Sequence, residues 1–405
     1  MTHTPRFPDP ASLFTVDRSG TCYRLTDPRW HGDDGSPLSL APLPACRPED
    51  IDTGERSLWR YAAALPVDRA HRVSLGEGCT PEVPLDWAGG RVRAKLEWFA
   101  PTSSFKDRGM AVLVSHLRGF GARHVLEDSS GNGGSSLAAY AAAAGLKGTV
   151  LVPEGTSAAK IAMVRAFGAR VEVVPGTRDQ VSAEAVRRSA SIPYASHAWH
   201  PMFLQGVKTL GYEIWESAGF RAPSDIVMVA GGGSQVLGCH LAFSELRAAG
   251  LVDRLPRLWL GQPEHFSPIV HLVEGTRPAE APSGSVPPPR TVAEGAAIDS
   301  PVRGPEVAAA VRESGGGAVA VGEEEIREAL TGLLRRGLYA EPTAAVAAAA
   351  LTRLRREGRL PAAGGEGQGR PRGQGASGAG EGTVLVLSGT GLKAADAMAR
   401  ALGAA

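Results

Sequence analysis

From about residue 90 onward, short apolar runs alternate with longer segments whose apolar residues recur at helical spacing. The short runs, rich in Val, Ile and Leu, predict strands at 91–97, 123–128, 148–153, 169–175, 225–230, 257–262 and 383–387. The longer segments predict helices at 110–117, 133–144, 157–167, 178–190, 203–217, 234–249, 323–336 and 342–356. Short strands separated by helices indicate βαβ units and a mainly parallel sheet.

The remaining segments lack this alternation. Residues 1–60 are irregular, 57–65 predict a first helix, and 74–85 have the Gly and Pro pattern of a loop. Residues 274–291 are rich in proline, and 364–382 contain mostly Gly, Gln, Arg and Glu. We expect both of these low-complexity segments to be surface loops.

Composition narrows the class of protein. The chain has 405 residues, enough for one large or two ordinary domains, and a formal net charge of +1. This balance gives no electrostatic reason to expect nucleic acid or a membrane as a partner. The four cysteines contain no Cys-x-x-Cys pair, so neither a zinc site nor a disulfide framework is expected. The N-terminus lacks the apolar core of a signal peptide, and a cytoplasmic location is expected.

Lys106 stands in the segment 101–109, PTSSFKDRG, between a predicted strand and a predicted helix. Backbone N–H groups and partial positive charge gather at such a junction. That environment disfavours an ammonium, so it suits a lysine that works as a neutral amine.

Three glycine-rich segments also follow predicted strands: 129–136 (SSGNGGSS), 230–235 (AGGGSQ) and 387–393 (LSGTGLK). Glycine lets the backbone approach a ligand, and the helix that follows offers unpaired N–H groups to an anion. The first segment suits a carboxylate, and the second suits a phosphate. Neither has the spacing of a P-loop or of a dinucleotide fingerprint, which disfavours both of those interpretations.

Together with 58–61 (LWRY), 76–81 (GEGCTP), 205–209 (QGVKT) and 341–342 (EP), these segments resemble a known family. The chain is similar to fold-type II enzymes dependent on pyridoxal 5′-phosphate (PLP), the tryptophan synthase beta-like superfamily, and most of all to threonine synthases. The resemblance covers roughly residues 57–262 and 292–400. It implies an α/β fold of two three-layer α/β/α domains with mainly parallel sheets and PLP in the cleft between them.

The same resemblance implies a domain scheme. Residues 1–90 would be an N-terminal extension with the first elements of the large domain, and 91–109 with 203–405 would form the large PLP-binding domain. Residues 110–202 would form a smaller mobile domain that closes over the cofactor. A homodimer is also implied, with a small amino acid as the substrate.

The resemblance further implies particular roles at the cofactor. Lys106 would form a Schiff base with PLP and act as the general base, and Asn132 would hydrogen-bond the phenolic oxygen. The phosphate would be held by Gly231, Gly232, Gly233 and Ser234. Ser388 would face the pyridine nitrogen, where a neutral hydroxyl moderates the electron sink and favours elimination or replacement.

The loop at 129–135 would receive the substrate carboxylate through Ser129, Ser130, Gly133 and Ser135. One departure bears on the substrate. Where threonine synthases carry the arginine that binds the substrate phosphate, this chain has Phe203, and His197 and His200 replace asparagines. Losing a guanidinium removes the strongest kind of phosphate contact.

Three functions remain open on this sequence. The first is a threonine synthase-like lyase that eliminates a leaving group from O-phosphohomoserine or an analogue and adds water. The second is a threonine or serine ammonia-lyase acting on an unphosphorylated hydroxy amino acid. The third is a binding subunit that keeps the fold without catalysis, which the intact Lys106, Asn132 and Ser388 argue against. The two histidines near Phe203 either take over the phosphate contact or pack with Trp199.

Overall fold

The computed structural model describes residues 9–276, 290–361 and 382–403. The two low-complexity segments predicted as surface loops lie almost entirely outside these residues. The chain divides into two compact units. The first consists of Met1–Cys79, Trp98–Tyr212 and Ser244–Ala249, and the second of Thr80–Glu97, Glu213–Phe243 and Gly250–Ala405. The prediction that residues 110–202 form a smaller mobile domain stays a prediction, because a single structure does not test motion.

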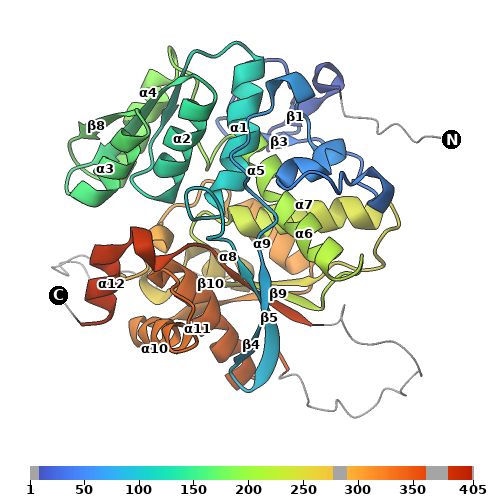
Figure 1. The fold of residues 1–405 in the computed structure, drawn as a ribbon, viewed down its shortest axis with the longest axis vertical. Helices are drawn as coiled ribbons and strands as arrows, with labels where there is room; N and C mark the ends of the chain where they lie inside the picture. Colours follow the sequence, from blue (N-terminus) through green and yellow to red (C-terminus); the bar gives the residue numbers. More distant parts are fainter. Residues whose placement is uncertain (1–8, 277–289, 362–381, 404–405) are drawn as a thin grey trace. The chain divides into compact units, whose positions relative to one another are not determined.

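The first unit contains a parallel sheet of order β6-β7-β8, which the alternation of apolar runs and helices predicts (Figure 1). Its strands are β6 (His124–Glu127), β7 (Lys147–Pro153) and β8 (Arg170–Val174). Its helices are α1 (Lys106–Gly119), α2 (Asn132–Ala143), α3 (Ala158–Ala166), α4 (Arg178–Arg188) and α5 (Pro201–Val207). A small antiparallel sheet precedes them, made of β1 (Phe14–Val16), β2 (Cys22–Arg24) and β3 (Ser39–Leu40).

Helix α1 packs closely against α5, and two glycines make this approach possible. A Cβ at Gly109 would clash with the ring of Phe203, and a Cβ at Gly206 would clash with the carbonyl oxygen of Arg108. Phe203 is fully buried as a result. The glycines therefore fix where α5 lies relative to the start of α1.

The second unit is built on a six-stranded sheet of order β11-β10-β9-β12-β5-β4, parallel except for the pair β4–β5. Its strands are β4 (Glu82–Trp87), β5 (Gly90–Leu96), β9 (Asp225–Val229), β10 (Arg257–Pro263), β11 (Gly317–Val321) and β12 (Thr383–Leu387). The further helices of the protein are α6 (Thr209–Ser217), α7 (Ser234–Ala248), α8 (Pro268–Glu274), α9 (Gly304–Glu313), α10 (Glu323–Leu334), α11 (Pro342–Arg356) and α12 (Ala395–Ala401).

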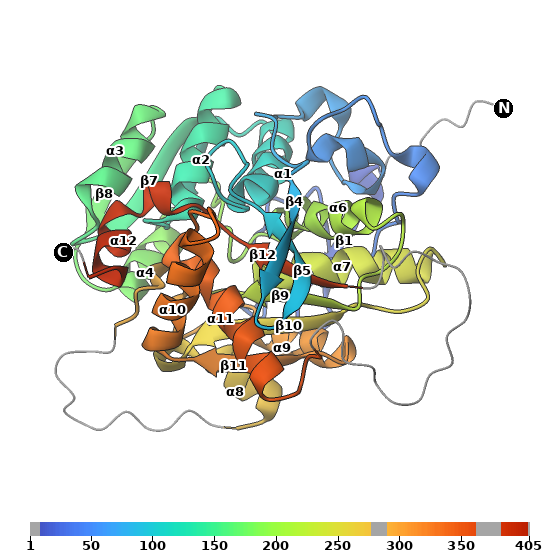
Figure 2. The ribbon, with the colours of Figure 1, turned by 60° about the horizontal axis from the view of Figure 1, so that its bottom comes forward.

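Alanine lets α11 lie close to this sheet (Figure 2). Its buried face carries a run of alanines, and Gly261 of β10 sits beneath it, where an added Cβ would lie 2.6 Å from the Cβ of Ala350. The Ala-rich composition in this part of the sequence thus has a packing reason, because small side chains allow short helix–sheet distances.

The α/β class with mainly parallel sheets is confirmed, as are all seven predicted strands within one or two residues. Three predictions of local structure are wrong or incomplete. Residues 57–65 form a 3-10 helix (Leu58–Ala64), the predicted loop at 74–85 runs into β4, and the single helix predicted at 203–217 is two helices that part at Lys208. The sequence pattern also missed α8, α9, β11 and α12.

Among the described residues, no helix has the length and apolar character to cross a membrane.

Candidate active site

Lys106 is the first residue of α1 and is half-buried. Its Nζ lies 4.5 Å from the ring centroid of Phe105 and 5.5 Å from that of Phe203. The amine is thus held between two aromatic faces at a helix N-terminus, where several backbone N–H groups lack an intrahelical partner.

Asp107, the next residue, fixes this position. Its carboxylate accepts hydrogen bonds from the backbone N–H of Thr102, the hydroxyl of Thr102 and the hydroxyl of Ser136, each at 2.6 Å. Asp107 is fully buried, and Ser136 lies on α2. One carboxylate therefore ties the loop before Lys106, the start of α1 and the body of α2 together. Sequence reasoning missed this residue, although its place beside Lys106 was a usable signal.

The predicted carboxylate-binding loop lies between β6 and α2. Ser129 and Ser130 are half-buried there, and α2 begins at Asn132. The hydroxyl of Ser135 donates to the carbonyl oxygen of Asn132 at 3.2 Å, within the first turn of the helix. Gly134 has no room for a side chain, because an added Cβ would clash with the carbonyl oxygen of Ser129. The loop backbone therefore folds tightly over the helix N-terminus, whose amides suit an anionic group.

The strand end before this loop carries two buried acids, Glu127 and Asp128. Asp128 accepts a hydrogen bond from the hydroxyl of Tyr194 at 2.7 Å and pairs with Arg178 at 2.9 Å. Arg178 also donates to the backbone carbonyl of Asp128. The guanidinium of Arg178 is therefore already engaged by Asp128.

Glu127 holds His197. The two side chains meet at 2.6 Å between Oε1 of Glu127 and Nδ1 of His197, and the backbone N–H of His197 donates to Oε2 at 3.3 Å. The ring of His197 lies against Phe203, with centroids 5.8 Å apart. A Cβ added at Gly133 would lie 2.9 Å from Nδ1 of His197, so the missing side chain at Gly133 makes room for this ring. Sequence reasoning considered His197 but missed Glu127.

Burial opposes charge on both members of this pair. It raises the pKa of Glu127 well above its ordinary value, and the neighbouring charge of Asp128 acts in the same direction. It lowers the pKa of His197 well below its ordinary value, and the positive charges of Lys106 and Arg178 add to that effect. Lys106 is therefore near enough to His197 for its positive charge to disfavour protonation of the imidazole.

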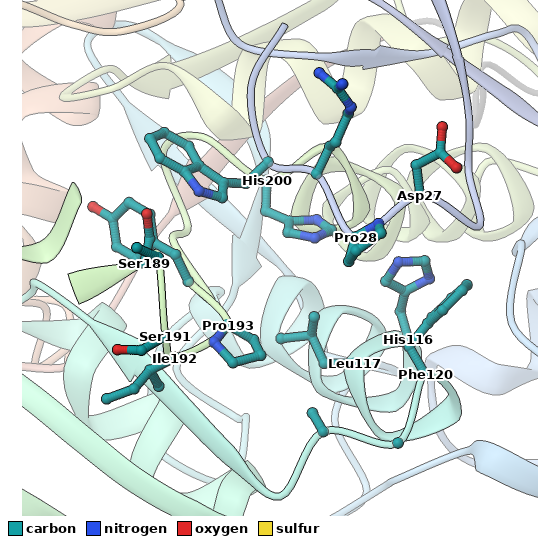
Figure 3. A pocket seen from close by; sticks show the side chains of 16 residues that line it. Asp27, Pro28, His116, Leu117, Phe120, Ser189, Ser191, Ile192, Pro193 and His200 are labelled. Carbon is teal, nitrogen blue, oxygen red and sulfur yellow. The ribbon is translucent and has the colours of Figure 1, made fainter. Parts of the chain in front are cut away.

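His200 has a different role. Its Nδ1 accepts a hydrogen bond from the backbone N–H of Met202 at 3.3 Å, which caps α5, and its ring lies 5.5 Å from that of His116. Both histidines line a pocket of about 450 Å³ in the first unit, together with Leu117, Phe120 and Ile192 (Figure 3). Burial lowers the pKa of His116 to about 3, so its imidazole is neutral near pH 7. This pocket is lined by none of the residues predicted to hold cofactor or substrate.

In the second unit, residues 231–233 form the turn between β9 and α7. Gly233 has a φ of +79°, and an added Cβ would clash with Val307, so only glycine fits there. A Cβ at Gly232 would meet nothing within 4 Å, which leaves one side of the turn open. Ser234 begins α7, a helix of 15 residues, so the turn presents amide groups at a helix N-terminus.

Ser388 follows the end of β12 and is buried. Its hydroxyl donates to Oε1 of Glu341 at 3.2 Å, and the backbone N–H of Glu341 donates to the carbonyl oxygen of Gly389 at 3.0 Å. The Ser-Gly and Glu-Pro segments, 47 residues apart in sequence, thus form one hydrogen-bonded group.

Comparison with known proteins defines the class. The family model for a pyridoxal-phosphate dependent enzyme matches residues 73–364, and the chain belongs to this family of PLP-dependent enzymes. Threonine synthase from Methanosarcina acetivorans is 36% identical over 315 residues, which cover 76% of each sequence. Threonine synthase from Methanocaldococcus jannaschii is 34% identical over 76% of this sequence and 78% of its own.

Solved structures agree with this class. Threonine deaminase from T.th. superposes with a TM-score of 0.57 at 26% identity, covering 75% of this protein and 88% of that one. Threonine deaminase isoform 2 from Solanum lycopersicum has a TM-score of 0.61 at 21% identity, covering 89% and 98%, and shows the fold alone. The predicted family and the dependence on PLP are therefore confirmed.

The residues present fit this cofactor. In the second unit, Gln235 follows the glycine turn and is buried, yet neither its amide oxygen nor its amide nitrogen has a hydrogen-bond partner within the described part of the protein. In the first unit, the hydroxyl of Ser104, two residues before Lys106, is fully buried and equally lacks a partner among described residues. Buried polar groups without partners are rare in proteins, so each of these two side chains is suited to contact a polar ligand.

Proposed function

We propose that this protein is a PLP-dependent, threonine synthase-like lyase that eliminates a leaving group from an activated amino acid and adds water. The observation that carries the proposal is the half-buried Lys106 at the first position of α1, whose neighbour Asp107 is hydrogen-bonded to Ser136 of α2. The threonine synthases that match three quarters of this sequence support the type of reaction.

In this proposal the first unit provides the reactive groups. PLP, when bound, supplies an electron sink for the bonds at the substrate Cα. Lys106 holds the cofactor and carries a proton to and from substrate carbon through its Nζ. Asn132 donates a hydrogen bond to the cofactor, and the loop residues Ser129, Ser130, Gly133 and Ser135 bind the substrate carboxylate. Asp107 is a positioning residue, because its hydrogen bonds hold the loop before Lys106 in place against the start of α1.

Residues of the second unit would bind the cofactor's other groups. The backbone amides of Gly231, Gly232 and Gly233 and the hydroxyl of Ser234 would bind its phosphate, with support from the otherwise unsatisfied amide of Gln235. Ser388, whose hydroxyl is hydrogen-bonded to Glu341, would interact with the ring nitrogen.

A second function is a threonine or serine ammonia-lyase. It is favoured by Phe203, which stands where a guanidinium would bind a substrate phosphate, and by the likeness to a threonine deaminase at 26% identity. A binding subunit without catalysis is the third candidate. Lys106, Asn132 and Ser388 are all present, and each has a catalytic or cofactor role in the first proposal.

The substitution Lys106→Ala tests the proposed function. The purified wild type should show the visible absorption of bound PLP, and the variant should lose both this absorption and at least about 1,000-fold in kcat, because the variant lacks the amine that carries the proton. Lys147→Ala, which alters an exposed lysine on β7, is the matched control and should retain both. A wild type that takes up no PLP would end the proposal.

Finer properties belong to the same proposal. Family resemblance supports a homodimer, a cytoplasmic location and closure of residues 110–202 over bound substrate. Sedimentation of the loaded protein checks the first of these, and limited proteolysis with and without substrate checks the last.

A further inference from the structure

Glu127 and His197 form a pair in the first unit that has no role in the proposed binding of the cofactor. Glu127 is fully buried and uses both carboxylate oxygens on His197, one on the ring and one on the backbone N–H. A buried carboxylate that orients an imidazole is a common arrangement for acid–base chemistry, because it fixes which ring nitrogen faces the substrate. The pair lies between β6 and the segment that leads into α5.

The surroundings of His197 place it at the predicted substrate loop. Its ring occupies the space left by the absent side chain of Gly133, and it contacts Phe203, which itself lies over Lys106. Nδ1 is engaged by Glu127, and no described residue hydrogen-bonds to the other ring nitrogen, Nε2. About 15% of the side chain stays exposed. Nε2 is therefore available to a ligand.

The charges near this pair disfavour a phosphate leaving group. The cations that act on it are Lys106, which the reaction needs, and Arg178, which pairs with Asp128. Asp128, a buried acid beside them, already takes up the charge of Arg178. Among the described residues of the first unit, the guanidinium that acts on this pair is the one that Asp128 already engages. A phosphate dianion bound beside His197 would therefore lack a charge partner there, and burying an unpaired charge is strongly unfavourable.

We propose that His197, oriented by Glu127, is the acid–base group at the leaving-group end of the substrate, and that the substrate is an amino acid whose side-chain leaving group is an uncharged hydroxyl or carboxylic ester. This inference rests on the proposed PLP-dependent elimination and specifies its substrate class. Phe203 then serves as an apolar wall in place of a phosphate-binding residue.

The proposed elimination conserves atoms, electrons and protons. A proton leaves the substrate carbon for Nζ of Lys106, and its electron pair forms the new carbon–carbon double bond as the bond to the leaving oxygen breaks with both electrons remaining on that oxygen. The leaving oxygen takes the proton from Nε2 of His197 and departs as water or a carboxylic acid, while the proton shared with Glu127 settles on Nδ1. When water adds to the double bond, its oxygen bonds to one carbon and gives a proton to Nε2, the Nδ1 proton returns to Glu127, and Nζ of Lys106 returns its proton to the other carbon.

The test compares substrates on the holoenzyme. Wild-type protein loaded with PLP is given O-phosphohomoserine, O-acetylhomoserine, homoserine, threonine and serine, and the release of phosphate, acetate, ammonia and 2-oxo acid is measured. We expect at least one unphosphorylated donor to exceed O-phosphohomoserine by roughly 100-fold or more in kcat/KM, which is the order expected when a site leaves a buried charge unpaired. Faster turnover of O-phosphohomoserine, or no turnover of any unphosphorylated donor, overturns the inference.

Variants test the role of His197. His197→Asn should lower kcat on the preferred donor by about 100- to 10,000-fold with a small change in KM, because it removes a proton donor and leaves binding intact. Glu127→Gln should lower kcat less and shift the pH profile of kcat, since the amide still orients the ring but cannot exchange a proton. His197→Gln is a second variant in case the first one folds poorly.

His240→Asn is the matched control, because His240 also contacts a carboxylate, that of Glu313 at 3.0 Å, and is assigned no part in the reaction. It should keep wild-type kcat. Retention of the PLP absorption in the His197 variants shows that they are folded and loaded, so a kcat that stays at the wild-type value in them contradicts the acid–base role. Absence of PLP from the wild type itself would instead refute the proposed function.

Discussion

At the residue scale, some residues of the candidate site can be recognised from their local sequence, and others cannot. Lys106 is marked by its neighbours in the sequence, and its place at the start of α1 follows from them. Glu127 and His197 are 70 residues apart, and nothing in either local sequence points to the other. Their pairing arises because β6 ends beside the segment that leads into α5, a consequence of how the first unit packs.

A buried acid away from the cofactor residues provides a prediction at this scale. Glu77 accepts hydrogen bonds from the hydroxyl of Tyr140 at 2.7 Å and the backbone N–H of Leu75 at 2.8 Å. Burial raises its pKa from 4.5 to about 7, although these hydrogen bonds oppose the rise. The unfolded protein therefore loses this proton at lower pH than the folded protein, and stability falls as the pH rises from about 4.5 to about 7.

Glu77→Gln should remove this pH dependence, because the amide stays neutral and can still accept both hydrogen bonds. As the pH rises from 4.5 to about 8, the free energy of unfolding of the wild type should fall relative to that of the variant, by at most about 3 kcal/mol. Urea titration at several pH values measures this difference. Glu154→Gln, at an exposed position, is the control and should show no such gain. Parallel pH curves for wild type and Glu77→Gln would disprove the assignment.

At the scale of elements, the junction of α5 and α6 is held by a buried ion pair. Lys208, where the predicted single helix parts into two, is fully buried and pairs with Glu245 of α7 at 2.8 Å. The hydroxyl of Tyr212 donates to the same carboxylate at 2.7 Å. Lys208 thus has a structural role in joining helices. Its segment, 205–209, is also one of those on which the resemblance to the family rests.

Removing one partner of this pair should be costly. Lys208→Met should lower the free energy of unfolding by about 3–5 kcal/mol, because Glu245 would be left buried without its counter-charge. The double substitution Lys208→Met with Glu245→Gln should recover much of the loss, since the amide can still accept the hydrogen bond from Tyr212. Chemical denaturation of wild type, both single variants and the double variant gives the coupling energy. A double variant as unstable as the sum of its singles would contradict this role.

At the scale of the whole molecule, each of the two units has its own parallel strands, and the proposed function depends on the binding of PLP. A ligand that binds only the folded state stabilises it by mass action. PLP at about 100 times its dissociation constant should therefore raise the free energy of unfolding by about 2.7 kcal/mol, and the melting temperature by several degrees.

Differential scanning fluorimetry of the protein with and without PLP measures this shift. Lys106→Ala should reduce it strongly, whereas Lys147→Ala should leave it unchanged. An equal shift for Lys106→Ala would mean that PLP binds elsewhere, and the residues assigned to the cofactor would need revision.

The sequence by itself determined the α/β class, the seven predicted strands and the family, and it predicts the residues proposed to bind PLP. These features are local: apolar runs form strands, glycine turns open helices, and Lys106 lies within its own signature. The sequence pattern missed β11 and α9 because their small residues carry little periodic signal, and it missed β4 because its segment begins among Gly and Pro.

Only the tertiary structure decided which side chains meet. It joined Glu127 to His197, Asp107 to Ser136, Ser388 to Glu341 and Lys208 to Glu245, each across at least 29 residues of sequence. Hydrogen bonds and buried ion pairs act over about 3 Å, so they depend on packing that no local pattern encodes. For the same reason His197 and His200, three residues apart, have different surroundings: one lies beside Phe203 and Gly133, and the other caps α5.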